Sequence, residues 1–403
     1  MLSACPARAS WPSLAEVWRA SRARAPQAVR AQGETRVARA AGVGARESSV
    51  HNPFVRVGAD HGVGRTPVGA SPGLVVDGEL GVPVELMGQR GARIRSADAF
   101  VAWREREQAA AEGQAGGEAI VAYGRALVAR ARADLAAQAE QQARSEVAWF
   151  DARAQVGDAT AVDRSLAQTE LARHQQTRAE AQIDLVSAEA DLRALTGMTD
   201  LSAPPDEPPP LPPAPGVDTG DRARAVRGEA SAASPAVQAL DRERAYWDRE
   251  ADASRAGRWM PLEIIGTAGQ DEFGQVRVGG ALGWSFPFLR RNEGDIARAT
   301  AAADRARADR EAVLGAVQAT VEGLDQRLTR TSEAVAELDR TGIPAAEGLV
   351  SATDAAFRAG KLELVRVLTA RRDLALMRER RLDLVEGGWR AYGDLASILG
   401  VLP

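Results

Sequence analysis

Hydrophobic and polar residues alternate in four short stretches of the chain. In the second stretch, apolar side chains occupy every second position and acidic ones lie between them: Leu74, Val76, Leu80, Val82, Val84 and Leu86 against Asp77, Glu79 and Glu85. Period-two alternation gives a strand one apolar and one polar face. The pattern predicts strands at about 53–65, 74–87, 261–270 and 275–288.

Two long stretches with helical character follow the predicted strand pairs. Residues 97–155 contain no proline, and residues 292–359 contain only Pro344. Their apolar positions are mostly Ala and Val, and each stretch predicts a helix of about 90–100 Å. Such helices need neighbours to bury their apolar positions. Each run ends near a glycine, Gly157 or Gly360, which reaches the positive φ of a reversing turn at little cost. We therefore expect two helical hairpins.

The two halves of the chain repeat one plan. At a constant spacing of 203 residues, Gly157 aligns with Gly360 and Gly197 with Gly400, without a gap between them. Each repeat is expected to contain a helix, two strands and a helical hairpin. The joining segment contains MTDLSAPPDEPPPLPPAPGVD, whose prolines predict an extended, polyproline-like linker. The expected divisions are an N-terminal segment at 1–12, a first repeat at 13–197, the linker at 198–229 and a second repeat at 230–400.

The predicted fold class is mainly α with a small β part. The predicted strands have about 10 residues, which is the length that a tilted membrane strand needs. Four strands cannot close a barrel by themselves, and open strand edges cannot lie in lipid. If these strands lie in a membrane, several chains must pool them, and three chains would supply twelve.

Composition narrows the function classes. The chain has 51 basic and 55 acidic residues, so its net charge of −4 gives no electrostatic case for binding nucleic acid. No stretch of sequence approaches the roughly 18–20 apolar residues of a membrane-spanning helix. The three histidines, His51, His61 and His174, lie in different predicted elements, and no triad or phosphate loop is present. We expect no enzymatic activity, no metal site and no cofactor.

The segment FRAGKLELVRVLTARRDLALMRERRLDLVEGGWRAYGDLASILG and the junctions PVELMGQRGARI and LGWSFPFLRRNEGDIARA resemble the TolC family of outer-membrane efflux proteins. The resemblance covers about 13–400. The glycine–arginine junction is most similar to the heavy-metal efflux branch. The resemblance implies a homotrimer in the outer membrane of a Gram-negative bacterium, with a twelve-stranded transmembrane β-barrel and an α-helical barrel. It further implies a periplasmic adaptor protein and an inner-membrane pump, of the RND type, as partners.

The resemblance also indicates where function lies. The hairpin tips, with Gly157, Asp158, Gly360 and Lys361, would dock the adaptor. Asp163 and Arg366 occupy equivalent repeat positions with opposite charge, so they form either a gate pair between hairpins or two solvated charges. Thr369 is the third gate candidate, and Arg366 and Thr369 stand where several family members carry acidic gate residues.

Two further candidates concern the membrane. Trp284, Phe286 and Phe288 share one parity of the fourth predicted strand, and form either an aromatic girdle at the membrane interface or a packing contact at the barrel base. Leu2-Ser3-Ala4-Cys5 resembles a lipobox. Cys5 is acylated if the true start lies upstream, or the match is chance.

The leading functional hypothesis is a passive export duct of a tripartite efflux pump. A type I secretion duct and a periplasmic coiled-coil adaptor or scaffold are the alternatives. The sequence does not identify the exported solute, so drugs, metal ions and other small solutes all stay open.

Overall fold

The computed structural model of the chain describes residues 11–61, 74–155, 160–199, 201, 209–213, 228–229, 231–270, 274–289 and 291–402. The chain divides into two compact units. Unit 1 comprises Met1–Gln32, Gln108–Val237 and Val313–Pro403, and unit 2 comprises Gly33–Glu107 and Gln238–Ala312. Each unit takes segments from both halves of the sequence, so the two repeats are not separate compact bodies.

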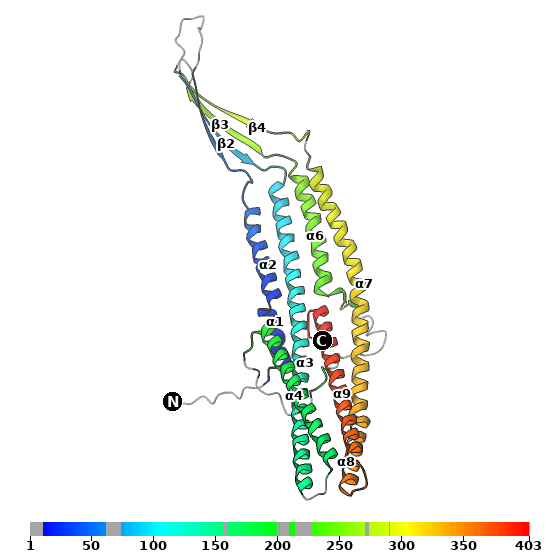
Figure 1. Cartoon of the computed structure of the whole chain (residues 1–403). Helices are drawn as coiled ribbons and strands as arrows, with labels where there is room; N and C mark the ends of the chain where they lie inside the picture. The colour runs from blue at the N-terminus through cyan, green and yellow to red at the C-terminus, as the bar shows by residue number, and fades with distance from the viewer. Residues whose placement is uncertain are drawn as a thin grey trace, which may run out of the picture. The chain divides into compact units, whose positions relative to one another are not determined.

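Unit 2 contains a four-stranded antiparallel sheet in the order β1-β2-β3-β4 (Figure 1). Its strands are β1 (Phe54–His61), β2 (Leu74–Val84), β3 (Leu262–Gln270) and β4 (Val276–Gly283). β1 and β2 come from the first half of the sequence and β3 and β4 from the second. The pairing of β2 with β3 therefore joins the two halves.

The register separates the side chains of the sheet onto two unlike faces. One row across the sheet reads Val57, Gly78, Ala268 and Val278. On this apolar face, ten large hydrophobic side chains are 38–81% exposed: Val55, Val57, Leu74, Val76, Leu80, Val82, Ile264, Val276, Val278 and Leu282. The opposite face carries the charged side chains and is called the polar face below. So large an exposed apolar surface marks a surface that another phase or partner covers.

The fourth strand is shorter than the sequence pattern predicted. We expected it at about 275–288, but β4 ends at Gly283, and Trp284 to Pro287 have no regular secondary structure. Gly283 pairs with Glu263, and β3 begins only one residue earlier, after Pro261. Proline lacks the N–H that a strand ladder needs, so Pro261, directly before β3, limits the pairing at this end of the sheet. The expectation that Trp284, Phe286 and Phe288 share a strand face is therefore wrong.

Four helices contribute to unit 2: α2 (Pro26–Ala45), α3 (Gln89–Gln155), α6 (Pro235–Ala256) and α7 (Glu293–Glu337). α2 and α6 each begin at a proline, whose fixed φ suits the first helical position and whose missing N–H is not needed there. Ion pairs join neighbouring helices. Arg39 pairs with Glu105 at 2.7 Å between α2 and α3, and Arg305 pairs with Glu243 at 2.5 Å between α6 and α7.

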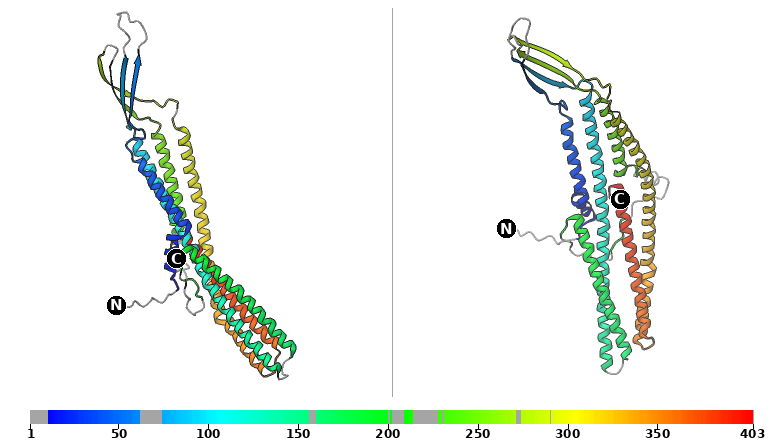
Figure 2. Two further views of the ribbon diagram at one scale, coloured as in Figure 1. Left: turned by 60° about the vertical axis from the view of Figure 1, so that its left-hand side comes forward. Right: turned by 45° about the horizontal axis from the view of Figure 1, so that its top comes forward.

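Unit 1 contains the two expected helical hairpins (Figures 1 and 2). The first consists of α3 and α4 (Ala161–Thr196), and the second of α8 (Ile343–Arg358), which follows α7, and α9 (Leu364–Leu399). α1 (Leu14–Arg24) packs against α4. The core combines small and aromatic side chains, among them Ala119, Ala126, Val17, Trp18, Leu192, Trp389 and Tyr392. Small residues let the helices approach closely: a Cβ on Gly117 of α3 would lie 2.4 Å from the carbonyl oxygen of Gly393 in α9.

The helix that leads into the second hairpin is interrupted. A π-helical turn at Leu338–Gly342 separates α7 from α8, and Pro344 follows at the start of α8. Proline removes one helical hydrogen bond and crowds the preceding turn, and a π-turn absorbs that change. Arg381 of α9 pins the turn by binding both carboxylate oxygens of Asp339, at 2.6 and 3.1 Å. The sequence pattern had predicted one continuous run through Pro344.

A short part of the proline-rich linker lies against α9. Pro209 and Pro212, three residues apart, are buried, and the carbonyl of Pro210 accepts a hydrogen bond from the indole N–H of Trp389 at 2.9 Å. A Cβ on Gly388 would touch Leu211 and Pro212 at 3.4 Å. Burial of every third residue suits a polyproline helix, which has three residues per turn. We call residues 209–213 the proline strap.

Candidate functional site

The helical hairpins of unit 1 meet in a small core near their turns, which we call the tip core. Phe150 of α3, Ala167 of α4 and Leu364 of α9 are buried together, and Phe357 of α8 packs against them. The ring centroids of Phe150 and Phe357 are 6.4 Å apart. All four hairpin helices thus contribute to one apolar cluster, which joins the two hairpins.

The second hairpin turns at Gly360. This residue has φ 70°, its N–H donates to the carbonyl of Phe357 at 2.8 Å, and the N–H of Lys361 donates to the carbonyl of Ala356 at 2.9 Å. A Cβ at Gly360 would meet nothing within 4 Å, so the backbone conformation alone requires glycine here. Gly157 and Asp158, the predicted turn of the first hairpin, lie outside the described residues, as does Cys5.

The predicted gate residues Asp163, Arg366 and Thr369 all lie in the first turns of α4 or α9. Asp163 forms a capping box with Thr160, whose hydroxyl donates to the Asp163 carboxylate at 2.6 Å. Thr369 donates its hydroxyl to the carbonyl of Val365 at 2.8 Å. Asp163 and Arg366 form no ion pair with each other within the described part of this chain. A pair between neighbouring protomers stays a prediction.

The ion pairs that do link the two hairpins involve residues the sequence reasoning missed. Arg371 of α9 pairs with Glu146 of α3 and, at 2.8 Å, with Asp354 of α8. Arg372 pairs with Glu170 of α4 at 3.3 Å. Arg371 is half-buried beside the buried Ala370, and burial lowers the pKa of its guanidinium. An arginine four residues after the apolar Val367, at helical spacing, was the available signal.

Further from the turns, Arg132 of α3 contacts three acidic side chains of α9. Its guanidinium lies 2.6 Å from Glu379, 2.7 Å from Asp383 and 2.8 Å from Glu386. Burial works to lower the pKa of Arg132, but the hydrogen bonds to Glu386 and Glu379 outweigh it, and the pKa is raised. The acidic residues fall at positions one helical turn apart, so one arginine holds a full stripe of α9 against α3.

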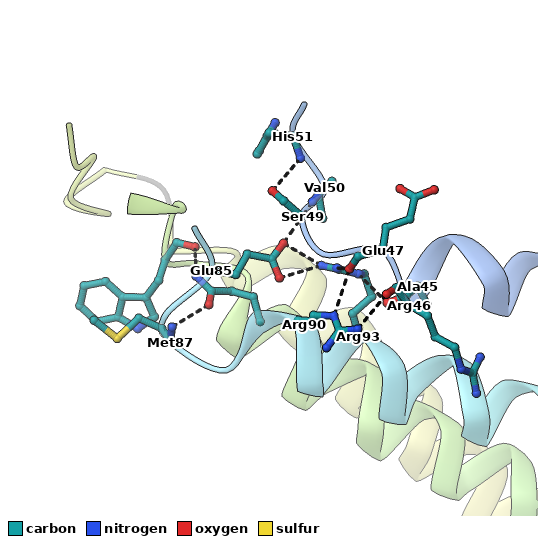
Figure 3. A network of polar contacts seen from close by, with 12 residues as sticks. Ala45, Arg46, Glu47, Ser49, Val50, His51, Glu85, Met87, Arg90 and Arg93 are labelled. Carbon is teal, nitrogen blue, oxygen red and sulfur yellow. Dashed lines mark hydrogen bonds and ion pairs between the residues drawn. The ribbon is translucent and has the colours of Figure 1, made fainter. Parts of the chain in front are cut away.

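In unit 2, arginines of the predicted glycine–arginine junction tie the strands to the helices (Figure 3). Arg93 binds both oxygens of Glu85, at 2.9 and 3.1 Å, just after β2. It also donates to the carbonyls of Ala45 and Glu47, at 3.1 and 3.0 Å. Arg90 donates to the carbonyls of Arg46 and Glu47. The two arginines thereby satisfy carbonyls at the end of α2, a position that also favours positive charge.

A cavity of about 350 Å³ lies beside this junction. Its lining includes Glu85 and Arg93, the pair of Ser96 and Glu250 at 2.6 Å, and Gln89, whose amide donates to the carbonyl of Trp259 at 3.1 Å. These polar groups bind one another across helices and loops. Because these polar groups are satisfied by protein partners, the cavity wall connects helices and loops structurally.

The predicted aromatic girdle residues form a continuous exposed row of tilted rings. The ring centroids of Trp284 and Phe286 lie 4.6 Å apart, and those of Phe286 and Phe288 lie 5.9 Å apart. Trp259 extends the row, with its ring centroid 5.9 Å from that of Trp284. Trp284, Phe286 and Phe288 are 38%, 56% and 74% exposed. The three residues are therefore together at the end of β4, although not on a strand.

In the described ranges, no group of three or more His, Cys, Asp or Glu side chains is arranged to hold a metal ion. Among the same residues, no helix has both the length and the apolar character needed to cross a membrane.

Comparison with known proteins identifies relatives over most of the chain. The family model of the outer membrane efflux proteins matches residues 18–198. The cobalt-zinc-cadmium resistance protein CzcC of Cupriavidus metallidurans is 26% identical over 346 residues, which cover 80% of this chain and 76% of that protein.

Solved structures with the same fold are more distant in sequence. A membrane protein from Pseudomonas aeruginosa superposes with a TM-score of 0.78 at 18% identity, covering 100% of this chain and 96% of that one. The channel-forming protein CusC gives 0.76 at 12% identity, with 96% and 92% covered. The outer-membrane channel MtrE of Neisseria gonorrhoeae, in its open state, gives 0.75 at 15% identity, with 99% and 94% covered.

Proposed function

This chain belongs to the family of outer membrane efflux proteins, the TolC family, and we propose that it forms the outer-membrane duct of a tripartite pump exporting metal cations. The duct is passive, because the pump supplies the energy and this chain supplies the path. Three chains assemble, and the trimer associates with a periplasmic adaptor and an inner-membrane pump. It resides in the outer membrane of a Gram-negative cell and extends into the periplasm.

The observation that carries this proposal is the sheet of unit 2. Its apolar face is exposed across all four strands, while its polar face carries the charges. β1 and β4 are unpaired at their outer edges within the sheet. A lipid-facing sheet needs both edges paired, and three copies joined edge to edge would supply a closed twelve-stranded barrel. A soluble adaptor or scaffold has no use for such a face.

The substrate class rests on the relative CzcC, which is named a cobalt-zinc-cadmium resistance protein. We therefore assign divalent metal cations as the exported solutes and an RND-type pump as the partner. Specificity then comes from the pump and adaptor.

We propose the tip core as the closed gate of the duct. Arg371 and Arg372 link the second hairpin to the first within one chain, and Asp163 with Arg366 would link neighbouring chains. The turns at Gly157–Asp158 and Gly360–Lys361 would dock the adaptor. Trp284, Phe286 and Phe288 would lie at the lipid interface, where exposed aromatic rings are stabilised. Cys5 would carry an acyl anchor if the mature chain begins there.

Two measurements test the duct. The protein should fractionate with the outer membrane, and detergent-purified trimers should give discrete conductance steps in planar bilayers. A strain lacking the gene should become sensitive to zinc, cadmium and cobalt, with unchanged sensitivity to unrelated drugs. A monomer recovered from the soluble fraction without detergent would refute the duct. Drug sensitivity with normal metal tolerance would refute the metal assignment alone.

The gate is tested by charge exchange. Asp163→Arg and Arg366→Asp should each raise the resting conductance, because each replaces attraction with repulsion. The double exchange should restore much of the closure if the pair forms between chains. An exposed pair contributes only about 0–1 kcal/mol, so recordings at low salt are the sensitive ones. Additive effects in the double variant would show two independent solvated charges.

A further inference from the structure

The polar face of the sheet is the more enclosed of its two faces. On β2, the polar-face residues Val75, Asp77, Glu79 and Gly81 are partly or fully buried, whereas Leu74, Val76, Leu80 and Val82 on the apolar face are exposed. Neighbouring side chains cover one another more on the concave side of a bent sheet than on the convex side. The polar face is therefore the inner one.

Two adjacent rows of the polar face carry charges that balance. The first row reads Arg56, Glu79, Thr267 and Gly279, and the second reads Gly58, Asp77, Gly269 and Arg277. Each row holds one basic and one acidic side chain, so each has no net charge. Both rows cross the middle of β2, away from the strand ends.

Arg56 is held in place by two neighbours. Its guanidinium lies 2.7 Å from the carboxylate of Glu79 and 5.4 Å from the ring centroid of Phe54. Phe54 in turn lies over Gly81, where a Cβ would come within 2.2 Å of the ring. An aromatic ring over a cross-strand glycine stabilises the pair and fixes the ring. Arg56 is thus pre-positioned along the sheet surface.

Glycines on the same rows leave room for the charged side chains. A Cβ at Gly58 would lie 2.7 Å from a carboxylate oxygen of Asp77, so Asp77 occupies the space that a larger residue would fill. Gly269 and Gly279 add no side chain on β3 and β4. Arg277 is then the one charged side chain that β3 and β4 add to the two rows, and the charge of these rows depends on few residues.

We propose that these two rows form a charge-balanced constriction at the exit of the duct, and that Arg56 and Glu79 set its selectivity. This inference rests on the proposed function, in which the polar face lines the pore. Because Arg56 neutralises Glu79, this pair favours neither cations nor anions. Removing either partner exposes one uncompensated charge per chain, and a narrow low-dielectric passage lined by one sign of charge concentrates counter-ions.

The test measures the cation-to-anion permeability ratio of trimers in planar bilayers, from reversal potentials in a potassium chloride gradient. Arg56→Gln leaves Glu79 unpaired and should raise the ratio. Glu79→Gln leaves Arg56 unpaired and should lower it. The two single variants should differ by on the order of tenfold. The double variant and the exchanged pair, Arg56→Glu with Glu79→Arg, should both return to the wild-type ratio.

Val57→Ala is the matched control, because Val57 is adjacent to Arg56 and points to the apolar face. It should leave the permeability ratio unchanged. The exchanged pair also guards against misfolding, since it retains both charges, and Arg56→Lys should behave as wild type. Trimer recovery is checked for every variant by native electrophoresis.

The outcomes separate the two proposals. Opposite shifts in the single variants, with restoration in the double, support the constriction. If the wild type forms pores and both single variants keep its permeability ratio, the proposed constriction is wrong and the proposed duct is unaffected. Shifts in the same direction overturn it as well. A wild-type trimer that forms no pore overturns the duct, and the constriction with it.

Discussion

The two helical hairpins of unit 1 share one sequence plan, yet they begin differently and end alike. α4 ends at Gly197 with φ 67°, and α9 ends at the equivalent Gly400 with φ 70°. At their starts, α4 has a capping box formed by Thr160 and Asp163, whereas the equivalent Glu363 makes no capping hydrogen bond. The two hairpins share backbone geometry where only glycine serves, and they differ where several side chains serve.

The interiors of the hairpins have diverged further. The long helix of the first hairpin, α3, is continuous over 67 residues, whereas its counterpart is broken at Leu338–Gly342. Val186 of α4 is 66% exposed, while Trp389, at the equivalent position of α9, is 3% exposed. α9 therefore lies in the centre of unit 1, and one face of α4 stays open. Equivalent positions in the two repeats serve as matched controls.

The largest expected contrast is between Trp389→Ala and Val186→Ala. Trp389 packs against Tyr123 and Tyr392 and holds the proline strap. Its truncation should lower the free energy of unfolding by about 3–5 kcal/mol. Val186→Ala should change it by less than about 0.5 kcal/mol. Urea unfolding in detergent, followed by far-ultraviolet circular dichroism, measures both. Equal effects would mean that α4 is covered as fully as α9 in the assembled protein.

Arg371→Met should have the next largest effect. It leaves Glu146 and Asp354 without their shared cation in a half-buried site, which should cost about 2 kcal/mol. The control is its neighbour Arg372→Met, which removes a more exposed pair and should cost less than about 1 kcal/mol. Urea midpoints report the stability, and resting conductance reports the gate. If Arg371→Met conducts like wild type while unfolding earlier, Arg371 stabilises the tip core without closing it.

The difference in capping between α4 and α9 can be removed either by deleting the cap of α4 or by adding one to α9. Thr160→Ala should destabilise the start of α4 by about 1 kcal/mol, because it removes the hydrogen bonds that the Thr160 hydroxyl makes with the N–H and the carboxylate of Asp163. Glu363→Thr should stabilise the start of α9 by a smaller amount, since Arg366 stands where the box needs an acid. Amide hydrogen exchange of the first turns measures these local changes. Unchanged exchange in Thr160→Ala would show that the cap contributes little in the trimer.

The smallest effect concerns pH. Burial lowers the pKa of His174 from 6.5, although Glu170 opposes the shift. The folded state therefore favours neutral His174, and its contribution to stability is present above pH 6.5 and is lost as the pH falls through the lowered pKa. His174→Gln should reduce this pH dependence by less than about 0.5 kcal/mol, given the partial exposure. The equivalent residue is Met377, which does not titrate. Urea midpoints of the wild type and of His174→Gln near pH 5 and pH 8 test this prediction. An identical change of midpoint with pH in the two proteins would contradict it.

Sequence periodicity predicted the regular elements because these depend on local pattern. The alternation at residues 74–86 and the reversing glycine Gly360 correspond to β2 and to the turn between α8 and α9. The end of β4 was missed, because Trp284, Phe286 and Phe288 continue the alternation after Pro261 has removed the pairing partner. Pro344 was noted, but its π-turn depends on how the helix absorbs a lost hydrogen bond, which periodicity does not encode.

The site was predicted less well than the fold. Asp163 and Arg366 have opposite charge at equivalent positions, which predicts a pair, but Asp163 already accepts a hydrogen bond from Thr160 within its own capping box. Arg371 was overlooked because arginine in a helix usually lies on a solvated face. Its role depends on Glu146 and Asp354, which are distant in sequence and meet it only in the folded chain. The junction arginines Arg90 and Arg93 lay in a motif whose family likeness was evident and whose contacts were not.

Because of the proline strap, cutting the chain before residues 209–213 and cutting it after them should have different consequences. A cut within residues 214–227 leaves the strap on the N-terminal fragment, while its receptor Trp389 belongs to the C-terminal fragment. A cut within residues 202–208 leaves the strap and Trp389 on one fragment. After the first cut, the strap of the N-terminal fragment can still bind Trp389 of the C-terminal fragment. After the second cut, this contact no longer joins the two fragments. Co-expressed fragments should copurify more readily after the first cut, which identifies the later site as the better place for circular permutation or for inserting a reporter domain.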